Sequence, residues 1–224
     1  MLTFPETASP RRVAALGECM IELSVGDDAL TARQLGFGGD TLNTAVYLAR
    51  CNPALRVSYV TALGTDPFSD AFVAAWHAEG LDTSAVHRLA GELPGLYAIR
   101  TDDRGERSFF YWRAQSAARS LLGQGRAAEL ANQLGGSSLI YLSAISVAIL
   151  SQPHRDLLSD LLTALRASGS QIAFDTNYRP LLWADRRAAQ REITRFGRMS
   201  SIVMPSAEDD AALFDDEGPS DTAR

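Results

Sequence analysis

Apolar and polar positions in the first half of the chain alternate between short apolar runs and longer segments with helical spacing. Val13–Leu16 and Val57–Leu63 are apolar runs of strand length, and each is followed by a glycine. Over Thr41–Arg50, apolar residues recur at three- and four-residue intervals, which indicates a helix that buries one face. Asp66-Pro67 then provides an N-cap and a first-turn proline for a helix that we expect to end at Gly80.

The second half of the chain repeats this order. Its predicted strands are Ser138–Ser143, Gln171–Asp175 and Ser201–Pro205. Its predicted helices are one capped by Ser151 and ended by Gly169, one over Asp185–Arg198, and one opened by Ser206 and Asp209 as a capping box. Strands that alternate with helices need crossover connections, so we predict an α/β fold with a mostly parallel sheet covered on both faces.

One region breaks this alternation. Leu96–Thr101 and Arg107–Trp112 are β-rich runs joined by the polar loop Asp102–Glu106, which contains Gly105. A glycine-containing loop between two such runs predicts a β-hairpin. Two paired strands alone are marginally stable, so we expect the hairpin to join a strand near Arg33–Phe37 in a small sheet beside the main one. The pattern alone fits a flap over a pocket and a plain edge hairpin equally well.

The composition limits the function classes. The 224 residues are 46% apolar and 21% charged with a net charge of −6, which is typical of a globular protein. The negative charge argues against a general binder of nucleic acid or of anionic membranes. All 21 basic residues are arginine. Within these residues, the absence of lysine excludes Schiff-base aldolases, pyridoxal-phosphate aldimines and a P-loop built on its lysine.

Cysteine, histidine and targeting signals add little. Cys19 and Cys51 form no Cys-x-x-Cys pair, so we expect no disulfide and no zinc site, and we predict a cytoplasmic location. His77, His87 and His154 are too scattered for a metal site. The N-terminus lacks the apolar core of a signal peptide and no apolar run reaches about 18 residues, so we predict no membrane span.

Two glycine-rich segments are candidates for anion binding. Gly36–Asn43 runs directly into the predicted helix, where adjacent glycines allow close approach and the helix start offers free N–H groups. It does not match the dinucleotide fingerprint, because Thr41 occupies the third glycine position. Gly123–Ala128 matches G-x-G-x-x-A, but no strand precedes it and no acidic residue lies about 20 positions on, so we interpret it as a loop.

Two arginines stand beside aromatic residues. Tyr111-Trp112-Arg113 ends the predicted hairpin, and Asn177-Tyr178-Arg179 follows the strand that ends at Asp175. Ligands of doubly wound sheets bind beyond the carboxyl ends of the strands, and arginine grips a carboxylate with two parallel hydrogen bonds. On spacing alone, surface arginines beside packing aromatics are the simpler interpretation.

Seven segments together resemble the ribokinase-like carbohydrate kinases, over essentially the whole chain. They are Gly17–Ser24, Gly36–Arg50, Leu93–Tyr97, Gly105–Arg107, Tyr111–Arg113, Tyr141–Ser143 and Asp175–Trp183. The resemblance implies a ribokinase-like α/β fold: a doubly wound, mostly parallel sheet with a small β-sheet lid. It also implies one incomplete domain over residues 1–224, with lid strands from about 21–38 and 95–113 inserted in it and the C-terminal part missing.

The resemblance also implies the site residues. Those for the substrate are Gly39, Asp40, Thr41, Leu42, Asn43, Tyr97, Tyr111, Trp112, Arg113 and Arg179. Those for the nucleotide are Asn177, Tyr178 and Arg179, with Arg179 holding the acidic end of the substrate. Glu22 stands where some relatives carry a substrate-binding aspartate. A homodimer formed through the lid is also compatible with the resemblance.

Within this family the chain is most similar to kinases of a 2-keto-3-deoxy sugar acid. The implied reaction is phosphorylation of 2-dehydro-3-deoxy-D-gluconate to its 6-phosphate, with ATP and Mg²⁺. The family's Gly-Ala-Gly-Asp signature does not occur in the sequence, so we expect its general-base aspartate to lie beyond Arg224. Two alternatives stay open: a kinase of a neutral sugar such as fructose, and a non-catalytic fragment that binds a sugar acid.

Overall fold

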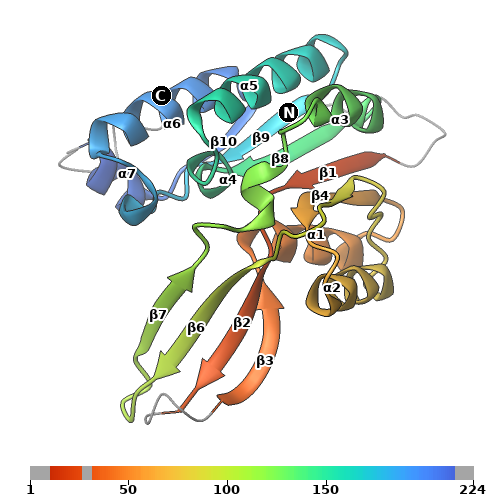
Figure 1. The fold of residues 1–224 in the computed structure, drawn as a ribbon. Helices are drawn as coiled ribbons and strands as arrows, with labels where there is room; N and C mark the ends of the chain where they lie inside the picture. Colours follow the sequence, from red (N-terminus) through yellow and green to blue (C-terminus); the bar gives the residue numbers. More distant parts are fainter. Residues whose placement is uncertain (1–10, 27–31, 215–224) are drawn as a thin grey trace.

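The computed structural model describes residues 11–26 and 32–214, which form two sheets and their covering helices (Figure 1). The strands are β1 (Arg12–Leu16), β2 (Met20–Val25), β3 (Ala32–Gly38), β4 (Arg56–Leu63), β5 (Val86–Arg88), β6 (Gly95–Thr101), β7 (Arg107–Trp112), β8 (Leu139–Ser143), β9 (Gln171–Asp175) and β10 (Ile202–Met204). The α-helices are α1 (Asp40–Cys51), α2 (Pro67–Ala78), α3 (Arg126–Leu134), α4 (Ala144–Ala148), α5 (Gln152–Ala167), α6 (Arg186–Met199) and α7 (Ala207–Phe214). Two short 3₁₀ helices are η1 (Ala117–Ser120) and η2 (Pro180–Leu182).

The larger sheet has six strands in the order β10-β9-β8-β1-β4-β5, and every neighbouring pair is parallel. β1 lies inside the sheet, between β4 and β8. The chain therefore winds outward from β1 in both directions, first through β4 and β5 and then through β8, β9 and β10. This order makes the sheet doubly wound and confirms the predicted α/β fold, with its switch point between β1 and β8.

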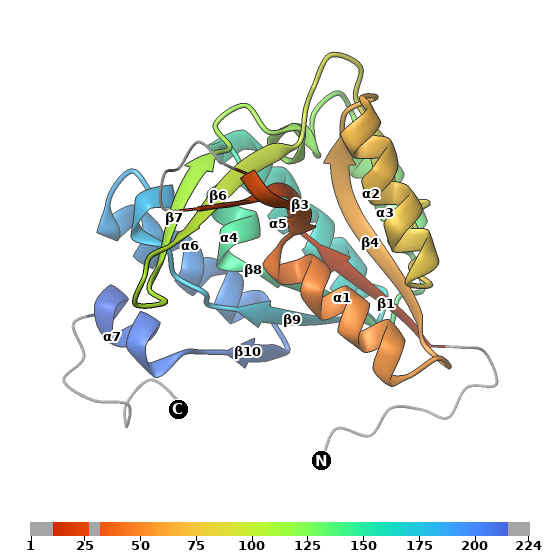
Figure 2. The same cartoon turned by 90° about the horizontal axis from the view of Figure 1, so that it is seen from below.

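Alternate side chains of these strands enter two separate cores. Ala14 and Leu16 of β1 pack in the core beneath α3, α5 and α6, whereas Ala15 packs in the core beneath α1 and α2. Val60 and Tyr59 of β4 divide in the same way. Figures 1 and 2 show these two layers of helices on opposite faces of the sheet. Because both faces are buried, the strands have nearly continuous apolar sequences instead of alternating ones.

The smaller sheet, called the lid below, has four strands in the order β3-β2-β6-β7 and projects away from the main sheet (Figure 1). β6 and β7 form the predicted antiparallel hairpin. The prediction that this hairpin shares a small sheet with a strand near Arg33–Phe37 is confirmed: that strand is β3, and β2 lies between it and the hairpin and pairs with both β6 and β3. Only three residues lie between the end of β1 and the start of β2, so the local pattern does not separate the two strands. Residues 27–31 of the expected lid range lie outside the described residues.

Most predicted helix ends are confirmed. The Asp66 carboxylate accepts hydrogen bonds from the backbone N–H groups of Phe68 and Ser69, each at 3.0 Å. The helix that follows, α2, ends two residues before Gly80, whose φ of +80° is the left-handed conformation that favours glycine. Ser151 precedes α5 as expected, but its side chain makes no capping hydrogen bond.

The capping box expected at α7 is only half formed. The Ser206 hydroxyl accepts a hydrogen bond from the backbone N–H of Asp209 at 3.4 Å. The Asp209 carboxylate instead accepts hydrogen bonds from Arg179, at 3.3 and 3.4 Å. The start of α7 is therefore tied to the segment that follows β9.

Two α-helices of the described residues were not predicted from the sequence. Gly123–Ala128, expected to be a loop, contains the start of α3: Gly125 precedes the helix with a φ of +78°, and the helix begins at Arg126. The other, α4, is a single short helix that begins directly after β8. Neither could be recognised from local spacing, because glycines precede α3 and α4 has too few residues for a period.

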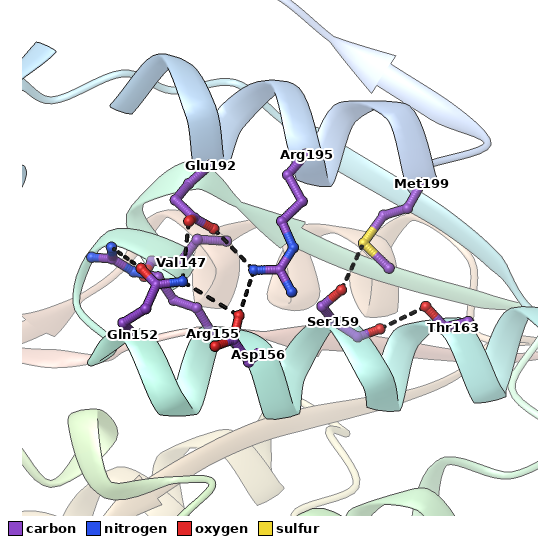
Figure 3. A network of polar contacts seen from close by, with 9 residues as sticks. All are labelled: Val147, Gln152, Arg155, Asp156, Ser159, Thr163, Glu192, Arg195 and Met199. Atoms are coloured by element: carbon purple, nitrogen blue, oxygen red, sulfur yellow. Dashed lines mark hydrogen bonds and ion pairs between the residues drawn. The ribbon is translucent and has the colours of Figure 1, made fainter. Parts of the chain in front are cut away.

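A polar network joins α5 to α6, which cover the same face of the main sheet (Figure 3). Arg195 of α6 donates a 2.6 Å hydrogen bond to Asp156 of α5, and Gln152 donates one of 3.2 Å to Glu192. Arg155 donates to two carbonyl groups at the end of α4 and lies over the Trp183 ring, 4.9 Å from its centroid. The helices of this layer are thus held to one another and to the loop after β9.

Among the described residues, none of the helices combines the length and apolar character needed to cross a membrane.

Candidate functional site

Polar groups converge where the carboxyl ends of three neighbouring parallel strands meet the start of α1. Glu18 follows β1, Ser143 ends β8 and Asp175 ends β9. Asp40 is the first residue of α1, which packs across β1 and β8. This place is the switch point of the sheet, where doubly wound folds bind their ligands.

Asp40 is the centre of the hydrogen bonds at this point. One of its carboxylate oxygens accepts from the backbone N–H of Thr41 at 2.8 Å. The other oxygen accepts from the Ser143 hydroxyl at 2.5 Å and from the Asn177 side-chain amide at 3.1 Å. The carboxylate also lies at a helix N-terminus, where a negative charge is favourable. The first turn of α1 is therefore fixed to β8 and to the segment after β9.

The glycines before α1 permit a close backbone approach. Gly39 has an extended φ of −179°, which any residue adopts, so its backbone angles do not require glycine. A Cβ at Gly39 would instead lie under 3.0 Å from the carbonyl oxygen of Glu18, and one at Gly38 under 3.0 Å from the Tyr97 hydroxyl. The glycine pair thus allows the start of α1 to pack directly on the β1–β2 connection and on the lid.

The next three predicted substrate residues have different environments. Thr41 and Leu42 are buried, and the Thr41 hydroxyl lies 3.4 Å from the Tyr59 hydroxyl in the core. Asn43 is exposed and lines a hollow of about 410 Å³ on the outer side of α1, together with Tyr47 and Cys51. The side chains of Thr41, Leu42 and Asn43 thus lie in the core or on the outer side of α1, and only the backbone of these residues lies beside Asp40.

The lid presents a cluster of aromatic rings on one face. Tyr97 and Tyr111 lie opposite each other on β6 and β7 with ring centroids 5.9 Å apart, and Phe109 lies 6.4 Å from each. The Tyr97 hydroxyl donates a hydrogen bond to the Glu22 carboxylate, and burial together with this carboxylate raises the pKa of Tyr97. Trp112 is 63% exposed, and strand alternation places it on the opposite face of the lid from Tyr97 and Tyr111.

Arg113 lies at the base of the lid and forms an ion pair with Glu18. The Arg113 side chain is 11% exposed and that of Glu18 is 1% exposed. Burial raises the pKa of the Glu18 carboxyl, and the Arg113 guanidinium opposes that shift. Glu18 was not among the predicted site residues, although a carboxylate directly after a buried strand was a signal in the sequence.

The segment after β9 places its three predicted residues in three directions. The Asn177 side chain reaches Asp40, whereas the Tyr178 ring is buried in the core beneath α5 and α6. Arg179 has a 53% exposed side chain, and its only ion pair in the described part of the chain is with Asp209. Its guanidinium donates to the Tyr178 carbonyl oxygen and to the Asp209 carboxylate at the surface of the protein.

Asp175 and Tyr141 complete the polar cluster. Burial raises the pKa of Asp175, and the nearby charge of Asp40 adds to this effect. The Tyr141 hydroxyl lies 3.4 Å from the Asp175 carboxylate, and burial raises the pKa of Tyr141 to about 12. Two carboxylates, Asp40 and Asp175, thus lie at the start of α1 and accept side-chain hydrogen bonds from Ser143, Asn177 and Tyr141.

Two further expectations concern cysteine and metal. Cys19 is buried and Cys51 exposed, and neither forms a disulfide within the described residues. In the same part of the chain, no group of three or more His, Cys, Asp and Glu residues could hold a metal ion.

Comparison with known proteins identifies the family of the chain. The model of the pfkB family carbohydrate kinases matches residues 10–224. The chain is 46% identical over 207 residues to the 2-dehydro-3-deoxygluconokinase of Escherichia coli K12, a match that covers 91% of this chain and 66% of that protein. It is 27% identical over 172 residues to the fructokinase of Salmonella typhimurium, which covers 77% of this chain and 53% of that protein.

Solved structures show the same fold. A PfkB protein from Polaromonas sp. JS666 superposes with a TM-score of 0.81 and 25% identity, over 93% of this chain and 69% of that one. The 2-dehydro-3-deoxygluconokinase of Thermotoga maritima superposes with a TM-score of 0.80 and 24% identity, over 93% of this chain and 64% of that one. The chain thus spans about two thirds of the length of the proteins it matches.

Proposed function

The chain belongs to the pfkB family of carbohydrate kinases, and from this membership we propose that the intact protein phosphorylates 2-dehydro-3-deoxy-D-gluconate (KDG) at its terminal hydroxyl to give the 6-phosphate. The observation that carries the proposal is the 46% identity over 207 residues to a kinase named for this substrate, against 27% to a fructokinase. The chemistry of the described residues supports an acidic substrate.

An anionic sugar fits the positive groups of the candidate site. Arg113 lies at the base of the lid, Arg179 follows Asn177 in the segment after β9, and α1 begins at Asp40. Arginine binds a carboxylate through charge-assisted hydrogen bonds, and a helix N-terminus favours negative charge. Asp40 and Asn177 are the groups that would accept from and donate to the hydroxyls of the sugar. The backbone of Thr41, Leu42 and Asn43 would complete this side of the pocket.

The lid would close over the sugar and exclude water. Tyr97 and Tyr111 share one face of the lid, and their neighbouring rings form a surface suited to the carbon chain of a sugar acid. Exclusion of water protects a phosphoryl group from hydrolysis during transfer. Trp112 lies on the other face of the lid, so its part in the site would be indirect.

The residues after β9 fit a nucleotide in part. Arg179 carries exposed donors of the kind that bind phosphate, and Asn177 has a side chain at the same edge of the sheet. The Tyr178 ring is buried, so only its backbone would face ATP. Mg²⁺, when bound with ATP, would neutralise phosphate charge. No carboxylate group of the described residues forms a metal site of three ligands.

Transfer itself needs a base for the proton of the attacking hydroxyl. The family resemblance assigns this role to the aspartate of a Gly-Ala-Gly-Asp segment, which these 224 residues do not contain. The described residues would therefore bind and orient the sugar, and the activity is a proposal for the intact protein. Positioning and electrostatic stabilisation supply most of the catalysis in phosphoryl transfer.

The lid also supports a homodimer. The face of the lid opposite to Tyr97 and Tyr111 carries Leu35, Phe110 and Trp112, whose exposed fractions are 58%, 49% and 63%. Exposed apolar side chains gathered on one face of a small sheet are typical of an interface.

We include in the proposal a cytoplasmic location, which two unpaired cysteines favour.

A coupled assay of ADP formation by the intact protein tests the proposed function. We expect turnover with KDG and ATP, and none above background with fructose or ribose. Turnover with fructose instead of KDG would identify a kinase of neutral sugars. Binding of KDG in calorimetry without any turnover or ATP binding would identify a non-catalytic sugar-acid binding protein.

A further inference from the structure

A buried ion pair joins the lid to the main sheet. Glu18 lies beyond the end of β1 and Arg113 beyond the end of β7, and they are 95 residues apart in the chain. The Arg113 Nη2 group donates to Glu18 Oε2, and both side chains are almost completely withdrawn from solvent. Burying two charges is costly unless they are paired, so Glu18 is what permits an arginine at this position.

The packing around this pair leaves it little freedom. A Cβ at Gly95, where β6 begins, would lie 3.0 Å from Glu18 Oε1 and 3.2 Å from the Cβ of Arg113. On the other side, the Gly39 backbone lies against the carbonyl group of Glu18. Glu18 therefore stands where three parts of the site meet: the end of β1, the start of α1 and the base of the lid.

The pair does not use all the donors of the arginine. Arg113 Nε is buried and has no hydrogen-bond partner among the described residues. A guanidinium has five N–H donors in a rigid fork, and a buried donor without a partner is costly. The unused donors of Arg113 suit an anion that arrives later at the same group.

We propose that Glu18 is a positioning residue for the substrate: it holds the guanidinium of Arg113 at the base of the lid in the orientation that receives the carboxylate of a sugar acid. The inference rests on the proposed function, because it needs an acidic substrate. Glu18 acts through Arg113 and makes no contact with the sugar. A neutral acceptor in its place would leave the buried guanidinium without its counter-charge and would hold it less strongly.

A double-mutant cycle on the intact protein tests this role. The variants are Glu18→Gln, Arg113→Met and the two combined, with Glu106→Gln at the exposed lid hairpin as the matched control. KDG affinity is measured by calorimetry, ATP affinity in the same way, and folding by thermal melting. We expect Glu18→Gln to weaken KDG binding about tenfold, and to change it less than about twofold when Arg113 is already Met. ATP affinity stays within about twofold in every variant, and Glu106→Gln resembles the wild type.

Each other outcome overturns a specific statement. Unchanged or tighter KDG binding by Glu18→Gln would overturn the positioning role, since loss of a negative charge alone would strengthen the binding of an anion. Equal weakening in both Arg113 backgrounds would show that Glu18 acts independently of Arg113, and would also overturn it. No KDG binding by the wild-type protein would overturn the proposed function together with this inference. Should Glu18→Gln fail to fold, Glu18→Asp takes its place in the cycle, because it keeps the charge but not the reach.

Discussion

The carboxylate of Asp40 accepts a 2.5 Å hydrogen bond from the hydroxyl of Ser143, although the two residues are 103 positions apart in the chain. Asp40 begins α1, and Ser143 ends β8 at the switch point of the sheet. The bond fixes the start of α1 against the edge of the sheet where doubly wound folds bind their ligands. The proposed sugar pocket therefore depends on this contact.

We predict that Ser143→Ala weakens KDG binding by about 1.5–3 kcal/mol, because hydrogen bonds to charged groups contribute about that much. Asp40 would keep its bond to Asn177 but lose its orientation. Isothermal calorimetry with KDG measures the effect. Ser146→Ala is the control, since Ser146 is also buried nearby but donates to the neutral carbonyl of Leu16 at 2.8 Å. Equal losses in the two variants would contradict a specific role of the Asp40–Ser143 bond.

Gly39→Ala should destabilise the protein by about 1–3 kcal/mol, the usual cost of overpacking. The added Cβ would lie under 3.0 Å from the carbonyl oxygen of Glu18, which is backbone and cannot move aside freely. Urea denaturation measures the change. Gly36→Ala is the control, because a Cβ at Gly36 meets nothing within 4 Å. The prediction fails if both variants are as stable as the wild type.

Arg179→Gln should weaken KDG binding by about 1.5–3 kcal/mol and change the free energy of unfolding by less than about 1 kcal/mol. The small effect on stability follows from the exposure of Arg179, whose ion pair with Asp209 lies at the surface. Calorimetry and urea denaturation measure the two quantities. Arg198→Gln, which changes an exposed arginine of α6, should alter neither. Unchanged KDG affinity in Arg179→Gln would separate this arginine from the substrate carboxylate.

Asp66→Ala should lower the free energy of unfolding by about 1 kcal/mol at pH 7, the typical value of an N-cap. Partial burial favours the neutral carboxyl, but hydrogen bonds from Ser69 and Phe68 outweigh it and hold the pKa of Asp66 below its ordinary value of 3.8. The contribution is therefore complete above pH 3.8 and is lost as the pH falls through the lower pKa of the folded state.

Urea denaturation at pH 7 and in steps below pH 4 checks this cap. The difference between the wild type and Asp66→Ala should shrink in acid. Asp66→Asn is the control, because asparagine caps helices without a titrating group, so its difference from Asp66→Ala should stay nearly constant. A wild-type advantage that persists at the lowest pH would contradict the assignment.

The elements that the sequence predicts correctly are those encoded by neighbouring residues. α1 and α5 follow from apolar spacing, and the β6–β7 hairpin from a polar loop with glycine between two β-rich runs. Helix α2 follows from Asp66 and Pro67. The local pattern misses helix α3, because glycines mask its start, and strand β2, because only three residues separate it from β1; only the family resemblance implies lid strands from about 21–38. The candidate site was predicted as residue types in motifs, not as contacts.

The sequence by itself determined the alternation of strands and helices, and with it the parallel sheet, because side-chain periodicity is a local property of the chain. Only the tertiary structure decided which of the motif residues face one another. It brings Asp40 into contact with Ser143 and Asn177. It pairs Glu18, which was not predicted, with Arg113, and it buries Leu42 and Tyr178 in the cores. These relationships join residues from different strands, helices and loops, and their free energy depends on burial and on distance across the sheet. No spacing along the chain encodes those two quantities.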